Sequence, residues 1–259
     1  MKKSANLDVI QNSFAVQAQR FEAPSMHFSK QEYLDYTVRC IAPSSRDRVL
    51  EVASGTCACG RALASHARAV TCLDATYQML EIGRQQADRL GLDNMTFILG
   101  DAGDLPFLNC SFDLVVSRLA FHHFPEADTP FAEMVRVLRP GGTLALIDME
   151  AAEASLRATE DQYEKLRDPS HVKNLSSHEM SRLFDSHNLS IRHCERTRIP
   201  VSLESWLELT QTPPGKRHII QTAMQREIEG LEATGFAPYR KDGAIYFDQR
   251  WLLIVGVKP

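Results

Sequence analysis

Short apolar runs alternate with amphipathic helical stretches between Arg48 and Met149, and this alternation limits the folds open to the chain more than any other feature. The runs are rich in Val, Leu and Ile, as strands buried on both faces of a parallel sheet are. The stretches between them repeat apolar residues with helical spacing, as at Phe131, Met134 and Leu138. A βα alternation of this kind predicts a parallel sheet. Its predicted strands are Arg48–Ala53, Ala69–Asp74, Met95–Leu99, Phe112–Ser117 and Thr143–Met149.

The pattern changes after Met149. Residues 155–167 and 177–187 have helical periodicity, while 190–201 and 250–258 resemble two further strands, which we expect to pair antiparallel at one edge. With these two strands, the predicted fold is of the α/β class. It has a doubly wound, mostly parallel sheet of seven strands with a Rossmann-like architecture. A helical stretch at 202–235 separates the last two strands, so we expect it to cap one end of the sheet and to close over a ligand.

We expect a single domain over residues 1–259. Its predicted parts are a helical N-terminal segment at 1–45, a ligand-binding core at 46–150, helical cap elements at 151–188 and 202–243, and the last two strands at 189–201 and 245–258. Proline and two glycines at Arg139–Pro140–Gly141–Gly142 predict a turn into the fifth strand.

Composition excludes several classes of protein. The formal net charge is −4, so no overall field favours nucleic acid or an anionic membrane as a partner. Two lysines near the N-terminus precede no apolar run, and no apolar run is long enough to span a bilayer, so we expect a cytoplasmic protein. The 6 cysteines are scattered. Cys57 and Cys59 form a C-x-C pair without a second pair of Cys or His at convincing spacing, so we expect small turn residues there and no metal.

Small and acidic residues follow three successive predicted strands. Ligands of a doubly wound sheet bind outside the carboxyl ends of its strands, where small residues let the backbone approach closely. Asp74 ends the second strand roughly 20 residues after the first, the spacing at which an acid accepts the hydroxyls of a ribose. Each residue alone has an ordinary alternative as a turn, helix cap or loop acid. The candidate ligand-binding residues at these ends are Glu51, Ala53, Ser54, Gly55, Gly60, Asp74, Asp101 and Ala102.

The stretch from Val49 to Met149 resembles the S-adenosylmethionine-binding domain of the UbiE/Coq5-like, class I methyltransferases. The segments that carry the resemblance are VLEVASGT, CLDATYQML, ILGDAGDLPF, SFDLVVSRLAFHHF and EMVRVLRPGGTLALID. The resemblance implies S-adenosyl-L-methionine as cofactor and S-adenosyl-L-homocysteine as product. It places Ala53, Ser54 and Gly55 under the methionyl part, Asp74 with Ala75 at the ribose, Met79, Asp101 and Ala102 around the adenine, and Ser117 and Arg118 near the amino acid end.

The chain departs from the family at two positions of the first loop, where Ala53 and Cys57 replace the usual glycines. Both replacements are small. If Cys57 must adopt a positive φ, we expect a strain of about 1 kcal/mol.

The loop after the fourth predicted strand contains Arg118, His122 and His123, and lies where the transferred methyl group should be. Histidine can act as a general base near neutral pH, so His123 is the first candidate for a catalytic base and His171 the second. The alternative is that these histidines only pack or cap. Asp168 and His171 occupy a turn between cap helices, and Trp206 could belong to an aromatic wall or to the cap core.

The sequence therefore predicts methyl transfer to a small-molecule acceptor such as a quinol, a phenol or a heterocycle. A sulfonium donor is already activated, so the protein mainly aligns the reactants, and a base is required only if the acceptor loses a proton. A nicotinamide oxidoreductase would need a G-x-G-x-x-G loop, which is absent after the first strand. A lyase, a cyclase or a non-catalytic protein that binds S-adenosylmethionine remain alternatives. The expected partners are the small-molecule acceptor and, if the protein forms a homodimer, a second copy of the chain.

Overall fold

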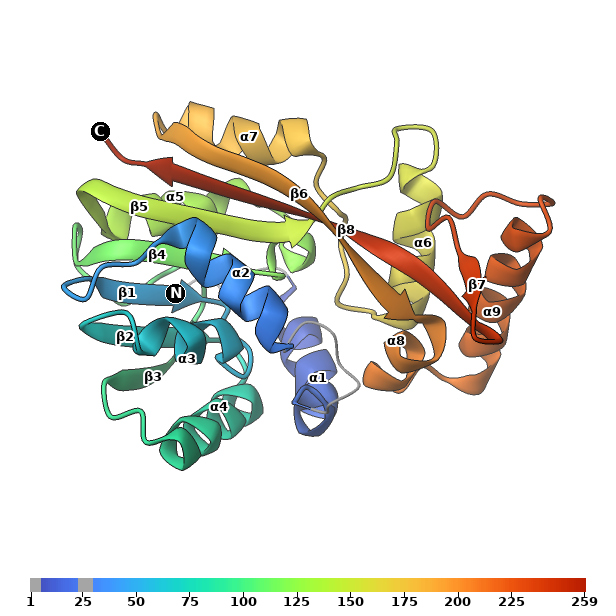
Figure 1. Ribbon diagram of the computed structural model, residues 1–259, viewed down its shortest axis with the longest axis horizontal. Coiled ribbons are helices and arrows are strands. Elements are labelled where there is room, and N and C mark those ends of the chain that lie inside the picture. Colours follow the sequence, from blue (N-terminus) through green and yellow to red (C-terminus); the bar gives the residue numbers. More distant parts are fainter. Residues whose placement is uncertain (1–5, 23–29) are drawn as a thin grey trace.

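The computed structural model describes residues 6–22 and 30–259, and the expectations for 1–5 and 23–29 lie outside these ranges. The described residues form an eight-stranded sheet in the order β3-β2-β1-β4-β5-β8-β6, with the short β7 paired to β8 (Figure 1). The strands are β1 (Arg48–Val52), β2 (Ala69–Asp74), β3 (Met95–Leu99), β4 (Phe112–Arg118), β5 (Leu138–Met149), β6 (Ser190–Ser202), β7 (Tyr239–Lys241) and β8 (Ala244–Val257).

The strand order reverses at β1, which pairs in parallel with both β2 and β4. The chain leaves β1 toward β2 on one side and leaves β4 toward β5 on the other. Because the two connections diverge, a crevice opens at the carboxyl ends of β1 and β4. β8 runs antiparallel to β5 and β6. β6 and β8 are long, and they extend beyond the parallel part of the sheet. The sheet thus creates the ligand-binding position that its sequence pattern predicts.

Helices cover both faces of the sheet. Leu34, Leu63 and Leu80 belong to one apolar cluster, which joins the sheet to α2 (Gln31–Ile41), α3 (Ala58–Ala64) and α4 (Tyr77–Leu90). Phe131 and Phe184 belong to a second cluster, which covers the other face with α5 (Asp128–Val137) and α7 (Ser177–Ser186). Figure 1 shows α2 in front of the sheet and α5 behind it.

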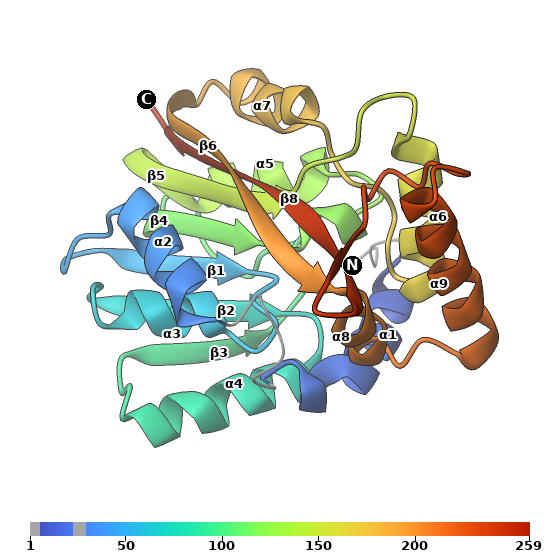
Figure 2. The same cartoon turned by 45° about the vertical axis from the view of Figure 1, so that its right-hand side comes forward.

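A helical lobe extends beyond the strand ends. It contains α6 (Arg157–Arg167), α8 (Leu203–Leu209) and α9 (Pro214–Ile228), and it lies beside the far ends of β6 and β8 in Figure 2. Trp206 packs against Phe236 and Phe247 at ring-centroid distances of 5.4 and 5.2 Å. An N-terminal helix, α1 (Leu7–Gln17), lies between α4 and α8 in Figure 1. No helix of the described segments is long and apolar enough to cross a bilayer.

The structure confirms the α/β class and corrects three details. The sheet has an eighth strand, because β7 folds back on β8 within the stretch predicted to be helical cap. Residues 139–142 extend β5 instead of forming only a turn, since Gly141 N–H donates to Lys258 O and Lys258 N–H to Gly142 O. The helical stretch predicted at 202–235 is two helices, α8 and α9, which Pro213 separates.

Gly83 is where α4 approaches the loop that follows β1. A Cβ atom there would lie 2.8 Å from both Cys57 Sγ and Thr56 O. We expect Gly83→Ala to cost about 1–3 kcal/mol, because α4 must move away from the loop. Gly215→Ala in α9 is the control: its Cβ would meet nothing within 4 Å, and alanine there should stabilise by up to about 1 kcal/mol. Urea denaturation of both variants tests this, and equal effects would show that the close approach is not tight.

Candidate functional site

A cavity of about 360 Å³ opens at the carboxyl ends of β1, β2 and β4, between the sheet, α1 and the helical lobe. Most of the residues predicted from the sequence line this cavity. They are Glu51, Ala53, Ser54, Gly55, Asp74, Ala75, Asp101, Ala102, Arg118, His123 and His171. Gly60, Met79 and Ser117 are buried but are not among its lining residues.

The loop after β1 has an unusual backbone. Ala53, Gly55 and Cys57 all have positive φ, at 54°, 53° and 59°. Left-handed backbone costs a residue with a Cβ roughly 1–2 kcal/mol, so the expected strain at Cys57 is present and Ala53 shares it. Ala53, Ser54, Gly55 and Thr56 of this turn line the cavity, and their small side chains let a ligand approach the backbone.

Asp74 holds this loop in place. Its Oδ2 accepts a hydrogen bond of 2.7 Å from Gly55 N–H, and its Oδ1 accepts one of 2.8 Å from Thr76 N–H. Burial raises the pKa of Asp74, and these amide bonds counteract the rise. Each carboxylate oxygen can accept a further bond. Asp74 therefore fixes the loop after β1 and retains acceptor capacity for a pair of hydroxyls.

Glu51 lies underneath the same loop. It is fully buried, and its Oε2 accepts a 2.8 Å hydrogen bond from Gly60 N–H in α3. Burial raises the pKa of Glu51 to about 7, although the Gly60 amide works against this. A Cβ on Gly60 would lie 2.6 Å from Glu51 Oε2 and 2.5 Å from Cys72 Sγ. Gly60 thus serves close packing of α3 on the sheet, which explains why it does not line the cavity.

The remaining predicted residues differ in whether they reach the cavity, which depends on where they lie in their strand, loop or helix. Side chains alternate across a strand, so Ser117 and Arg118 of β4 lie on opposite faces. The Arg118 guanidinium stacks on the Trp251 ring at 4.9 Å, at the cavity wall. Asp101 lines the cavity, and its Oδ1 also accepts Gly103 N–H at 2.9 Å. Met79 is fully buried in the first turn of α4.

Three histidines cluster where the cavity meets the helical lobe. The rings of His122 and His123 are 4.1 Å apart between centroids, and those of His122 and His171 are 5.7 Å apart. His122 Nδ1 lies 2.6 Å from Asp148 Oδ1, inside the cavity wall. Burial disfavours the charged imidazole, but the Asp148 carboxylate outweighs it and raises the pKa of His122. The His122–Asp148 pair was not predicted from the sequence, although both residues lie in the segments that resemble the family.

His123 and His171 have different partners. Ser170 Oγ donates to Asp168 Oδ1 at 2.6 Å, so it can only accept from His123 Nδ1, 3.1 Å away. Burial, with the nearby His122, lowers the pKa of His123 to about 3. His171 Nε2 lies 2.7 Å from Asp161 Oδ1, while its Nδ1 is buried and has no hydrogen-bond partner among the described residues.

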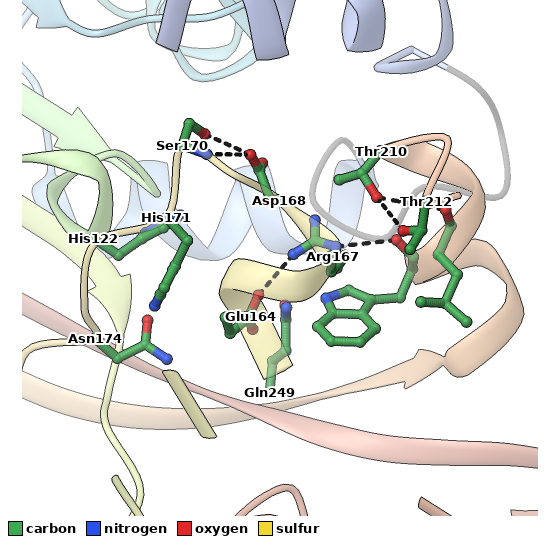
Figure 3. Close-up of polar contacts among 12 residues, drawn as sticks. His122, Glu164, Arg167, Asp168, Ser170, His171, Asn174, Thr210, Thr212 and Gln249 are labelled. Carbon is green, nitrogen blue, oxygen red and sulfur yellow. Dashed lines mark hydrogen bonds and ion pairs between the residues drawn. The ribbon is translucent and has the colours of Figure 1, made fainter. Parts of the chain in front are cut away.

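The helical lobe supplies a polar wall (Figure 3). Arg167 Nη1 donates to Glu164 Oε2 at 2.8 Å and its Nε donates to Trp206 O at 3.1 Å. The guanidinium also stacks on the Trp206 ring at 4.6 Å. Both charges of this ion pair line the cavity. The positive charge of Arg167 is therefore balanced by the Glu164 carboxylate within the protein.

Helix α1 covers the cavity, which the sequence did not reveal. Three of its polar side chains, and that of Asn6 just before it, hold it down. Gln11 Nε2 donates to Ala75 O (2.8 Å), Ser13 Oγ to Asp168 Oδ1 (2.8 Å) and Gln17 Nε2 to Asp168 Oδ2 (3.0 Å). Asn6 Nδ2 donates to His123 O (3.2 Å) and Ser170 O (3.0 Å). Phe14 packs edge-on against His123 at 5.0 Å. One helix therefore contacts both the loop that follows Asp74 and the histidine cluster.

Comparison with known proteins agrees with this geometry. The chain matches the family described as "Methyltransferase domain" over residues 49–142. It is 28% identical over 233 residues to "Uncharacterized methyltransferase YcgJ" of Bacillus subtilis, which covers 89% of this chain and 92% of that protein. The crystal structure of YcgJ has a TM-score of 0.80 at 27% identity, and the match covers 88% of this chain and 99% of that one. The chain belongs to the class I S-adenosylmethionine-dependent methyltransferases.

Two further relatives of this methyltransferase are similar over part of its length. "Uncharacterized protein YafE" of Escherichia coli is 34% identical over 151 residues, 58% of this chain and 73% of that protein. "Demethylmenaquinone methyltransferase" of Clavibacter sepedonicus is 36% identical over 142 residues, 54% of this chain and 57% of that protein. The donor of the methyltransferase is S-adenosylmethionine. The strand ends fit it, because the first loop has only small side chains and Asp74 still has acceptor capacity.

We expect Asp74→Ala to weaken S-adenosylmethionine binding at least tenfold. Charge-assisted hydrogen bonds contribute about 1.5–3 kcal/mol each, and 1.4 kcal/mol is one decade of affinity. Asp101→Ala should weaken binding less, because an adenine amine offers a single bond that water can replace. Calorimetric titration with the donor measures both. The control is Asp88→Ala, which removes an exposed partner of Arg84 on α4. Unchanged binding by Asp74→Ala would show that the ribose lies elsewhere.

We expect the amides of α1 to exchange with deuterium faster in the free methyltransferase than with S-adenosylhomocysteine, since its bonds to Ala75, Ser170 and Asp168 must break to uncover the cavity. Asp168→Asn should speed this exchange in both states, because two of the latching bonds end on that carboxylate. Helix α7, on a covered face of the sheet, is the internal reference. Equally slow exchange of α1 in all samples would contradict a moving lid.

Proposed function

We propose that this methyltransferase transfers the methyl group of S-adenosylmethionine to a small hydroxylated or heterocyclic acceptor, such as a quinol or a phenol, and that His122 takes the proton of the acceptor. The observation that carries the proposal is the 2.6 Å contact between His122 Nδ1 and Asp148 Oδ1 in the cavity wall. A histidine oriented by a buried carboxylate is a general base whose tautomer is fixed.

Asp148 is held rigidly for this role. Besides His122, it accepts hydrogen bonds from the amides of Ala120 (3.1 Å), Phe121 (2.6 Å) and Met149 (2.7 Å). Burial alone would raise the pKa of Asp148, but His122 and these amides lower it, so the carboxylate stays ionised. It therefore accepts Nδ1–H and leaves the lone pair of His122 Nε2 for the acceptor.

The two histidines chosen from the sequence have other roles in this proposal. His123 donates Nδ1–H to Ser170, and with a pKa of about 3 it is a much weaker proton acceptor than its neighbour. We assign it to the wall that joins α1 to the site. His171 donates Nε2–H to Asp161, so its Nδ1 carries a lone pair without a partner in the described structure. We propose that this nitrogen accepts a hydrogen bond from the acceptor.

The charge of the helical lobe supports an uncharged acceptor. Arg167 in the helical lobe is bonded to Glu164 and stacked on Trp206, which leaves little of its charge for a phosphate or a carboxylate. Phe14, Trp206 and Leu209 add apolar wall suited to a ring. The name of the Clavibacter relative, which is similar over about half of each chain, supports a quinol within this class.

The protein's contribution is then alignment and proton transfer. The donor supplies an activated methyl group. Holding donor and acceptor in line under α1 can supply roughly 7–11 kcal/mol of the barrier, and a positioned base a further 10²- to 10⁴-fold in rate, to order of magnitude. The helical lobe and the covering helix enclose the reacting atoms, which would limit access of water to them.

We expect kcat to rise with pH and to level off above a midpoint higher than 6.5, because the base must be unprotonated and Asp148 raises the pKa of His122. Asp148→Asn should lower kcat by about 10²- to 10⁴-fold, since it disturbs the tautomer of His122, and should move the midpoint to lower pH. His122→Asn should remove the pH dependence. The assay measures S-adenosylhomocysteine formed with quinol, phenol and heterocycle acceptors.

The matched control is His187→Asn. His187 Nε2 lies 2.9 Å from Asp128 Oδ1, but this His–Asp pair is outside the cavity. Its loss should leave kcat and the pH midpoint unchanged. Full turnover by His122→Asn, with donor affinity intact by calorimetry, would exclude a base at this position and leave alignment alone.

A further inference from the structure

Three side chains of metal-ligating type meet on the face of the sheet covered by α2, away from the cavity. The thiol of Cys40, a ring nitrogen of His193 and a carboxylate oxygen of Glu195 all lie within 4.8 Å of one another. His193 Nε2 and Glu195 Oε2 are 3.0 Å apart. None of the three residues lines the donor and acceptor cavity.

The fold brings these residues together from distant parts of the chain. Cys40 lies in the last turn of α2, while His193 and Glu195 are two positions apart on β6, so both point to the same face. The β6–β8 register shifts between Ile191 and His193, and β6 pairs with no strand but β8 in the described sheet. The cluster therefore connects a surface helix to an edge strand.

We propose that Cys40, His193 and Glu195 bind a divalent transition-metal ion of the zinc type, with a water molecule as fourth ligand. Sulfur, imidazole nitrogen and carboxylate oxygen are the three donors that zinc uses in proteins, at roughly 2.0–2.3 Å. Donors around one tetrahedral ion are then roughly 3.3–3.8 Å apart, close to the separations of up to 4.8 Å in the present cluster. A thiolate and a carboxylate also balance the two charges of the ion.

A tyrosine hydroxyl lies beside the cluster. Tyr36 precedes Cys40 by one helical turn, and its hydroxyl group interacts with the Cys40 thiol and with Thr197 on β6. The same hydroxyl could donate to a carboxylate or water molecule bound to the ion, as groups around metal ligands commonly do.

The C-x-C pair of Cys57 and Cys59 plays no part in this site. Both residues are buried, at the end of the loop after β1 and in the first turn of α3. The metal would instead join α2 to β6, so its expected effect is on the stability of the fold and not on donor binding.

Cobalt(II) is the probe, because its bond to a thiolate gives an absorption band in the near ultraviolet. We expect the metal-free protein to bind about one cobalt ion per chain with this band, zinc to displace it, and zinc to raise the melting temperature. Cys40→Ser should abolish the band, and His193→Gln or Glu195→Gln should weaken binding at least tenfold, because loss of a ligand should cost no less than loss of a group that orients a ligand, roughly 10- to 100-fold. Cys194→Ser is the matched control, since Cys194 is an exposed thiol on the opposite face of β6.

A second measurement keeps the test valid if a variant does not fold. In the unaltered protein, zinc should protect Cys40 but not Cys194 or Cys110 from alkylation, as mapped by mass spectrometry of the peptides. The proposal is overturned if the band is absent, if it persists in Cys40→Ser, if it is lost in Cys194→Ser, or if zinc protects none of the thiols. All of these readouts are independent of methyl transfer.

Discussion

The contact on which the site depends most is that between the Asp74 carboxylate and the amides of Gly55 and Thr76. The loop after β1 contains Gly55 and has three residues of positive φ, two of which carry a Cβ, so it would relax to another conformation if nothing held it. The hydrogen bond from Gly55 N–H to the buried carboxylate holds the loop, and the Thr76 amide fixes the carboxylate itself. The carboxylate that is expected to meet the ribose is thus also the group that shapes the floor beneath the methionyl part.

Buried carboxylates near the ends of two other strands also accept hydrogen bonds from backbone amides. Glu51 at the end of β1 binds the amide of Gly60, and Asp148 at the end of β5 binds the amides of Ala120 and Phe121. A buried carboxylate without partners would be very costly, and loop amides near the ends of parallel strands lack sheet partners. Each acid and the amides that it binds satisfy one another, so the sheet fixes the first turn of α3 and the short turn after β4.

The parts of the site that could be predicted from the sequence are those that depend on residues close together in the chain. Strand-end acids such as Asp74 stand next to a visible apolar run, so pattern alone located them. Helix α1 contacts residues more than a hundred positions away through Asn6, Ser13 and Gln17. These look like ordinary surface residues in a sequence. Adjacent histidines could not be distinguished either, because the short turn at Phe121–His123 decides which ring meets Asp148. β7 has only three residues, too few for an alternating pattern to show.

The position of α1 also has a kinetic meaning. Side chains of α1 and of Asn6 before it contact Ala75, where we expect the donor, and Asp168 and Ser170, where we propose the acceptor. If the helix lifts as one body to uncover the cavity, release of S-adenosylhomocysteine and release of the methylated product are linked events. The rate at which the helix lifts would then set an upper limit on the rate of turnover.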